Sequence, residues 1–141
     1  MSRAIDNLLK AQQRAMKIRP KVGGFPYLAE VLRSEGVSSN IWSLPSCQSL
    51  YITRDGPVIH QGVPLVTGPV DVPQFNQEAL IFAIRKDQSA EGNFPEFLKG
   101  VWGAGVIRYD VDFTKRMVTY RGCMGEEYVE MYPEVNIPPS S

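Results

Sequence analysis

The chain has 141 residues, of which 43% are hydrophobic and 21% charged, and its 15 basic and 15 acidic side chains give a net charge of zero. This length is typical of one domain, and the composition is that of an ordinary globular protein. No apolar run approaches the ~20 residues of a membrane span, and the N-terminal residues lack the apolar core and cleavage site of a secretory signal. We therefore expect a cytoplasmic protein without a membrane partner.

The first part of the chain predicts two helices. Over residues 3–18, apolar side chains recur with the spacing of one helical face. Pro20 and the glycines that follow it end this helix. Pro26 suits the first turn of a second helix, because its fixed φ is helical and its missing N–H is not needed there. Gly36 is a natural left-handed stop for that helix.

Three short strands are predicted next, over residues 40–44, 49–54 and 58–60. The pair Asp55-Gly56 is a favourable turn between the second and third strands. The following stretch, residues 62–75, contains three prolines and two glycines. Because proline cannot donate to a strand ladder, residues 63–75 are predicted to be an extended linker between two halves of the chain.

The second half repeats this order of elements. Asn76 is a good N-cap for a third helix, while Pro95 opens a fourth helix that Gly105 closes. Apolar and charged residues alternate at the start of the segment 108–120, which is the clearest strand signal in the chain and predicts a hairpin. Residues 127–131 complete a second group of three strands.

An internal echo connects the two halves. Residues 23–62 are matched without a gap by residues 92–131, which lie 69 positions later, and seven of the forty positions are identical. Most of these seven are glycine or proline at the ends of predicted elements: Gly23, Phe25, Pro26, Gly36, Val37, Tyr51 and Gly56.

We therefore predict an α+β fold built from two similar units, residues 1–62 and 76–131. Each unit contains two helices and a three-stranded meander, and both pack as one pseudo-twofold domain, residues 1–141, with an antiparallel sheet. A lone meander would leave an apolar face and two open edges, which is why the two units should pair.

Several segments resemble an uncharacterised bacterial family, a domain of unknown function with YdfO-like prophage-encoded relatives that is often labelled "phage envelope protein". In the second half these are residues 94–97, 104–109 and 118–122, and in the first half residues 36–37 and 40–45, which are similar to longer members. The resemblance covers nearly the whole chain. It implies a small α+β fold of bacteria and prophages, and it brings no catalytic residues.

Charge is unevenly distributed along the chain. Residues 1–21 carry six basic side chains and one acidic side chain, whereas the remainder carries nine basic and fourteen acidic ones. A basic first helix can contact phosphate, or it can lie over the acidic part of its own chain or of a partner chain. Because the chain shows neither an overall basic character nor a nucleic-acid-reading motif, nucleic acid is not the expected partner.

Three side chains carry potential chemistry: Cys47, His60 and Cys123. They could form a Cys–His nucleophile pair or a three-ligand zinc site if the fold brought them together. No CxxC or HxxxH spacing supports either site, so no metal, cofactor or catalytic residue is predicted. Since no secretory signal is expected, a disulfide is not expected either.

Acidic residues on the second hairpin are a further candidate. Asp110 and Asp112 alternate on one strand and therefore face the same side, where Glu127 could approach them. Such a cluster can hold a magnesium ion. The favoured interpretation is a solvated sheet face on which these acids pair with Arg108, Lys115 or Arg116 across the hairpin.

Aromatic residues are frequent on the predicted strands. Trp42, Tyr51 and Tyr120 could stack nucleobases, but basic side chains between them are scarce, so packing in the core or a protein interface is favoured. Together with Cys47, His60 and Cys123, these aromatic residues form the candidate ligand-binding set.

Common nucleotide-binding, hydrolase and metalloprotease signatures do not occur in the sequence. The leading hypothesis is a non-enzymatic interaction or accessory protein of bacterial or prophage origin that acts through protein contacts, as a homodimer or with a protein partner. The alternative is a small-molecule-binding module or cryptic enzyme with its site between the two units, where ligand clefts commonly form.

Overall fold

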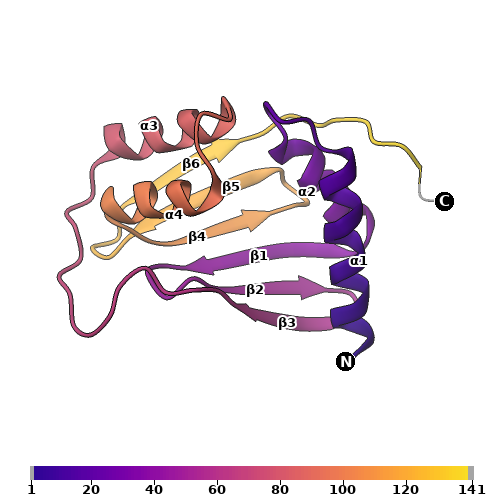
Figure 1. Ribbon diagram of the computed structural model, residues 1–141, viewed down its shortest axis with the longest axis horizontal. Helices are drawn as coiled ribbons and strands as arrows, with labels where there is room; N and C mark the ends of the chain where they lie inside the picture. The colour runs from indigo at the N-terminus through magenta and orange to yellow at the C-terminus, as the bar shows by residue number, and fades with distance from the viewer. Residues whose placement is uncertain (1, 140–141) are drawn as a thin grey trace.

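A computed structural model describes residues 2–139 (Figure 1), so both ends of the predicted domain 1–141 lie outside the described residues. The fold is α+β, as predicted. Two helices precede three strands, and after the linker this order recurs. The elements are α1 (Arg3–Ile18), α2 (Phe25–Ser34), β1 (Val37–Ser43), β2 (Gln48–Thr53), β3 (Gly56–Gln61), α3 (Gln77–Gln88), α4 (Phe94–Gly103), β4 (Val106–Asp112), β5 (Met117–Gly122) and β6 (Glu127–Met131).

The helices begin at polar caps and prolines. The Asn76 side chain accepts a hydrogen bond from the backbone N–H of Ala79, which confirms this residue as the N-cap of α3. Asn93, which the sequence interpretation missed, caps α4 in the same way. Pro26 and Pro95 lie in the first turns of α2 and α4. Within residues 2–139, no helix is both long and apolar enough to span a membrane.

All strands pair antiparallel in one sheet with the order β3-β2-β1-β4-β5-β6. The two groups of three strands therefore meet at β1 and β4. Asn40 lies opposite Tyr51 in one hairpin, and Tyr109 lies opposite Tyr120 in the other, so residues 69 positions apart share a pairing register. This agrees with two similar units, while the pseudo-twofold relation between them stays a prediction.

Two strands are longer than the sequence suggested. β1 begins at Val37, which pairs with Thr53, rather than at residue 40. β3 spans Gly56–Gln61 rather than residues 58–60. In both cases backbone pairing continues through residues without an alternating apolar pattern, because a partner strand supplies the hydrogen bonds.

All four helices of the described chain contact the same face of the sheet, here called the inner face. In Figure 1, α4 lies across β4 and β5, and α1 crosses the right-hand ends of β1, β2 and β3. The helix–strand contacts on the inner face include the pairs Gln12–Tyr51, Arg85–Glu130 and Phe97–Tyr109. α2 adjoins the same layer, and its Ala29 lines a hollow together with Phe113 of the β4–β5 turn.

Aromatic rings form a continuous ladder on the inner face. Trp42 of β1 stacks on Tyr109 of β4 with a centroid distance of 6.0 Å. Tyr109 in turn lies 5.5 Å from Tyr120 of β5, and Tyr120 lies 6.4 Å from Tyr128 of β6. Each such pair is worth about 0.5–1.5 kcal/mol beyond its buried area. The ladder therefore ties β1 to the strands of the second half.

In each half, one glycine follows the second helix and adopts a left-handed conformation, as the sequence predicted. Gly36 has φ +93° and Gly105 has φ +88°. At Gly105 the backbone of the linker passes so close that a Cβ atom would lie 2.5 Å from the Cα of Phe75. The linker is thus held against the end of α4, where the N–H of Asn76 also donates to the carbonyl of Ala104 at 2.8 Å.

Replacing Gly105 with alanine should strongly destabilise the fold. A left-handed backbone costs alanine about 1–2 kcal/mol, and displacing the linker backbone adds a similar or larger cost. We expect a loss of about 3–5 kcal/mol in the free energy of unfolding, measured by urea denaturation. Gly125→Ala is the matched control, because Gly125 has the same φ but open space around its Cα, and it should lose only about 1–2 kcal/mol. Equal losses would contradict the role given to the linker.

Candidate interaction surface

The three side chains with potential chemistry lie apart. Cys47 is buried in the turn between β1 and β2, His60 is exposed on the edge strand β3, and Cys123 is exposed in the turn between β5 and β6. Because β4 separates β1 from β5, the two cysteine-bearing turns are about 10 Å or more apart. No three His, Cys, Asp or Glu side chains in the described part of the chain are grouped so as to hold a metal ion.

Cys47 is shielded from chemistry by its surroundings. Burial raises the pKa of its thiol, and a backbone hydrogen bond from Leu65 opposes this only in part. The thiol is therefore protonated at neutral pH, whereas the thiolate is the reactive form. The backbone of Cys47 is left-handed, with φ 60°, and its carbonyl accepts a hydrogen bond from the N–H of Gly62 at 2.9 Å. Its role is to shape the turn.

The three aromatic candidates all belong to the inner face. Tyr51 and Tyr120 are buried, and Trp42 is half-buried in the aromatic ladder. Burial raises the pKa of both tyrosines, so their phenols are neutral. The Tyr51 hydroxyl forms hydrogen bonds with Ser49 and with Gln12 of α1. These contacts are those of core packing, one of the two roles that the sequence favoured.

The acidic residues of the second hairpin are held by basic partners. Asp110 accepts hydrogen bonds from Arg108, at 2.6 and 2.9 Å, and from Arg121 at 2.9 Å. Arg121 also donates to Glu127 at 2.7 Å. Asp112 accepts the backbone N–H groups of the following turn. The predicted pairing of Asp110 with Arg108 is confirmed, but it runs along β4, and the partner across the hairpin is Arg121, which the sequence did not indicate. We call Arg108, Asp110, Arg121 and Glu127 the ion cluster.

The opposite side of the sheet, here called the outer face, presents three rows of cross-strand partners that run from β3 to β6. The middle row consists of Ile59, Leu50, Ile41, Asp110, Thr119 and Val129. The polar row consists of Gln61, Gln48, Ser43, Arg108, Arg121 and Glu127. The third row consists of Pro57, Ile52, Ser39, Asp112, Met117 and Met131.

Large apolar side chains of the outer face are exposed to water. The exposed fractions are 60% for Ile59, 36% for Ile52, 44% for Val129 and 62% for Met131. Leu50 and Ile41 adjoin the two isoleucines, Met117 adjoins Met131, and all three are half-buried. Between these two apolar groups, β4 contributes Arg108, Asp110 and Asp112. Single exposed apolar residues are ordinary on protein surfaces, but a contiguous apolar area marks an interaction site. The outer face is therefore the strongest candidate for an interaction surface.

The two sheet edges are less suited to binding another strand. The edge strand β3 contains Pro57, which has no N–H to donate, and the edge strand β6 carries Glu127 and Glu130. Proline and charged residues protect edge strands against pairing with other chains. The edges of the sheet are therefore weaker candidates for an interaction surface than the outer face.

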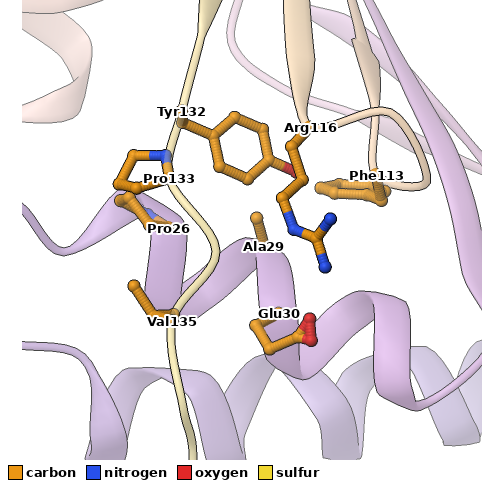
Figure 2. A pocket seen from close by; sticks show the side chains of 8 residues that line it. All are labelled: Pro26, Ala29, Glu30, Phe113, Arg116, Tyr132, Pro133 and Val135. Carbon is orange, nitrogen blue, oxygen red and sulfur yellow. The ribbon is translucent and has the colours of Figure 1, made fainter.

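A hollow beside α2 receives the segment after β6 (Figure 2). Tyr132 packs edge to face on Phe25 of α2 at 5.2 Å, and in Figure 2 its ring lies beside Arg116. Burial raises the pKa of Tyr132 to about 12. The hollow has no room for a water-sized sphere. It is a packing contact that fastens residues 132–135 to α2, not a ligand cavity.

The basic first helix is anchored to its own chain. Arg14 forms an ion pair with Glu35 at 3.3 Å and donates to the carbonyl of Pro138 near the C-terminus. This agrees with the alternative in which the first helix lies over its own chain. The acidic Glu134, however, pairs with Arg116 of the β4–β5 turn at 3.5 Å rather than with α1.

No protein-family model matches the chain, so the resemblance to the YdfO-like family stays a prediction. The chain is 50% identical over 135 residues to the uncharacterised protein Rv2012 of Mycobacterium tuberculosis strain H37Rv, and equally to the uncharacterised proteins MT2067 of Mycobacterium tuberculosis strain CDC 1551 and Mb2035 of Mycobacterium bovis. The match covers 96% of this chain and 82% of each relative.

The two thiols should differ sharply in reactivity. In the native protein, we expect dithionitrobenzoate to modify Cys123 within minutes, whereas Cys47 should react on the order of 100-fold more slowly because it requires local unfolding. Absorbance of the released thiolate checks this. The variant Cys123→Ser should show no fast phase, and denaturant should expose the second thiol. Two fast thiols in the native protein would contradict the buried position of Cys47.

Proposed function

We propose that this chain, which belongs to the family of the mycobacterial proteins Rv2012, MT2067 and Mb2035, is a non-enzymatic interaction protein that binds a protein partner through its outer face. The observation that carries the proposal is the exposed apolar group on that face, Ile59, Ile52, Val129 and Met131. The mycobacterial relatives support a bacterial origin for the accessory role, while an association with prophages rests on the sequence resemblance alone.

The outer face has the composition of a protein interface. Its apolar side chains occupy the middle row and the third row, while the polar row lies at one end of the strands. Burying an exposed isoleucine or methionine completely is worth about 1.5–3 kcal/mol. Several such side chains on each side of β4 can dominate affinity, and the polar residues beside them provide hydrogen bonds.

Catalysis and small-molecule binding receive less support from the same geometry. Cys47 is buried, while His60 and Cys123 lie on separate elements. Asp110 is neutralised by Arg108 and Arg121. Between the two units, the aromatic ladder fills the inner face beneath α4. The titratable groups that a reaction needs are therefore dispersed or already paired.

The proposal is tested by comparing two substitutions of exposed apolar residues. Ile59→Lys places a charge on the outer face at its β3 edge, whereas Phe82→Lys changes a large apolar side chain on α3 that is 71% exposed and belongs to the helical layer. Tagged wild type, tagged Ile59→Lys and tagged Phe82→Lys are each mixed with an extract of the cells that naturally produce the protein. Untagged chain is added to each mixture, and the proteins retained by the tagged chain are quantified by mass spectrometry.

We expect wild type and Phe82→Lys to retain the same protein, and Ile59→Lys to retain at least tenfold less, which corresponds to about 1.4 kcal/mol of binding free energy. The physical reason is that a buried ammonium without an anionic partner is costly. Retention that is unaffected by Ile59→Lys, or no retained protein at all, would exclude the outer face as the interaction surface. Thermal denaturation of each variant controls for folding.

A further inference from the structure

We infer that the partner of the outer face is a second copy of this chain, and that two copies pack face to face as a twofold-symmetric homodimer. This inference rests on the proposed use of the outer face for binding. Packed sheets lie about 10 Å apart with their strands within about 30° of each other, which lets two such faces interlock. The argument for a second copy comes from the order of residues along the three rows.

Twofold symmetry allows two simple arrangements of the faces. If the axis runs parallel to the strands, β3 lies over β6 of the second copy and β2 lies over its β5, so that each row meets the same row. If the axis runs across the strands, the polar row meets the apolar part of the third row. Only the parallel axis brings like surfaces together, and it is the arrangement that we adopt.

The middle row is self-complementary under this axis. Ile59 faces Val129 of the second copy, and Leu50 faces Thr119, which is only 7% exposed in its own chain. Ile41 faces Asp110, whose carboxylate oxygens are already held by arginines of its own chain. Because the contact is isologous, each of these pairs occurs twice in the dimer.

The other two rows show the same correspondence. In the third row, Ile52 faces Met117 of the second copy, and Pro57 faces Met131. In the polar row, the uncharged side chains of β1, β2 and β3 face the charged side chains of β4, β5 and β6, so no two like charges meet. The polar-row pairs are Gln61 with Glu127, Gln48 with Arg121 and Ser43 with Arg108.

Charge and size are also compatible with self-association. The ion cluster contains two arginines and two carboxylates, so its formal charges cancel and two copies do not repel each other there. Six strands about 4.8 Å apart and about five residues long give a flat footprint of roughly 500 Å². This footprint lies just below the ~600 Å² per partner at the low end of specific stable interfaces, and the projecting side chains add area to it.

A pair of single substitutions tests both the partner and the axis. Ile59→Lys and Val129→Glu each place a charge opposite an apolar side chain in both contacts of the dimer. A mixed dimer of the two variants instead contains one Lys–Glu contact and one native Ile–Val contact. Within one chain, residues 59 and 129 lie on opposite edge strands, five strand spacings or roughly 24 Å apart, so they cannot compensate each other internally.

Sedimentation velocity at about 1 to 100 µM measures the outcome. We expect wild type and the control Phe82→Lys to be dimers, each single variant to show a dissociation constant raised at least tenfold, and the equimolar mixture to regain most of the dimer. Circular dichroism and thermal melting confirm that every variant is folded, and Ile59→Ser provides a milder substitution if Ile59→Lys does not fold.

Three results would overturn the inference: a wild type that is monomeric at 100 µM, a dimer that neither variant weakens, or single variants that stay monomeric on mixing. If the wild type is monomeric but retains a different protein that the Ile59→Lys variant does not retain, the homodimer is overturned and the interaction function stays in place. A monomeric wild type whose binding is indifferent to Ile59→Lys would overturn both.

Discussion

The antiparallel pairing of β1 with β4 is the contact on which the rest of the molecule depends. Each half of the chain supplies two helices and three strands, and a three-stranded meander alone would leave both of its edges open. The pairing converts two such edges into the centre of one six-stranded sheet. It also brings Trp42 onto Tyr109, so the backbone pairing and the aromatic ladder cross the same junction.

The same pairing determines what each face of the sheet becomes. Once the two meanders join, the helices of both halves lie on the inner face and bury its aromatic residues. The outer face of the described chain receives no helix, and its rows extend without interruption from one half to the other. Apolar residues of β1–β3 and of β5–β6 thereby become parts of one surface. A candidate interaction surface that spans six strands therefore arises from the joining of the halves.

Much of the fold was predictable from residues that act locally. Asn76, Pro26, Pro95, Gly36 and Gly105 determine where helices begin and end, because capping, fixed φ and left-handed backbone are properties of single positions. The start of β1 was placed too late, since its first residues include Ser38 and Ser39, whose polar side chains give no strand signal. Their place in the sheet is decided by hydrogen bonds to β2.

The candidate site was less predictable, because it depends on strand order. Leu50, Tyr51 and Ile52 are consecutive apolar residues, so their sequence does not tell which of them faces the helices. In the same way, the distance between Cys47 and Cys123 follows from β4 lying between their turns.

The echo between the halves also continues where the residues differ: Cys47 and Arg116, 69 positions apart, both adopt left-handed backbone, with φ of 60° and 55°. Turn geometry can persist while side-chain chemistry changes.

The ion cluster limits how a partner can approach the outer face. Burying ionised groups is costly unless each retains its hydrogen bonds, and a pair that is fully satisfied before binding avoids most of that cost. Asp110 has both oxygens occupied by arginines of its own chain, so it can be covered without needing a partner's charge. The cluster then contributes to the orientation of a partner more than to its affinity, because a charged group placed over the cluster would lie near a side chain of like charge as well as one of opposite charge. In the proposed binding mode the exposed apolar side chains supply the attraction, and the cluster, which extends from the centre of the sheet to one end of the strands, favours one direction of docking.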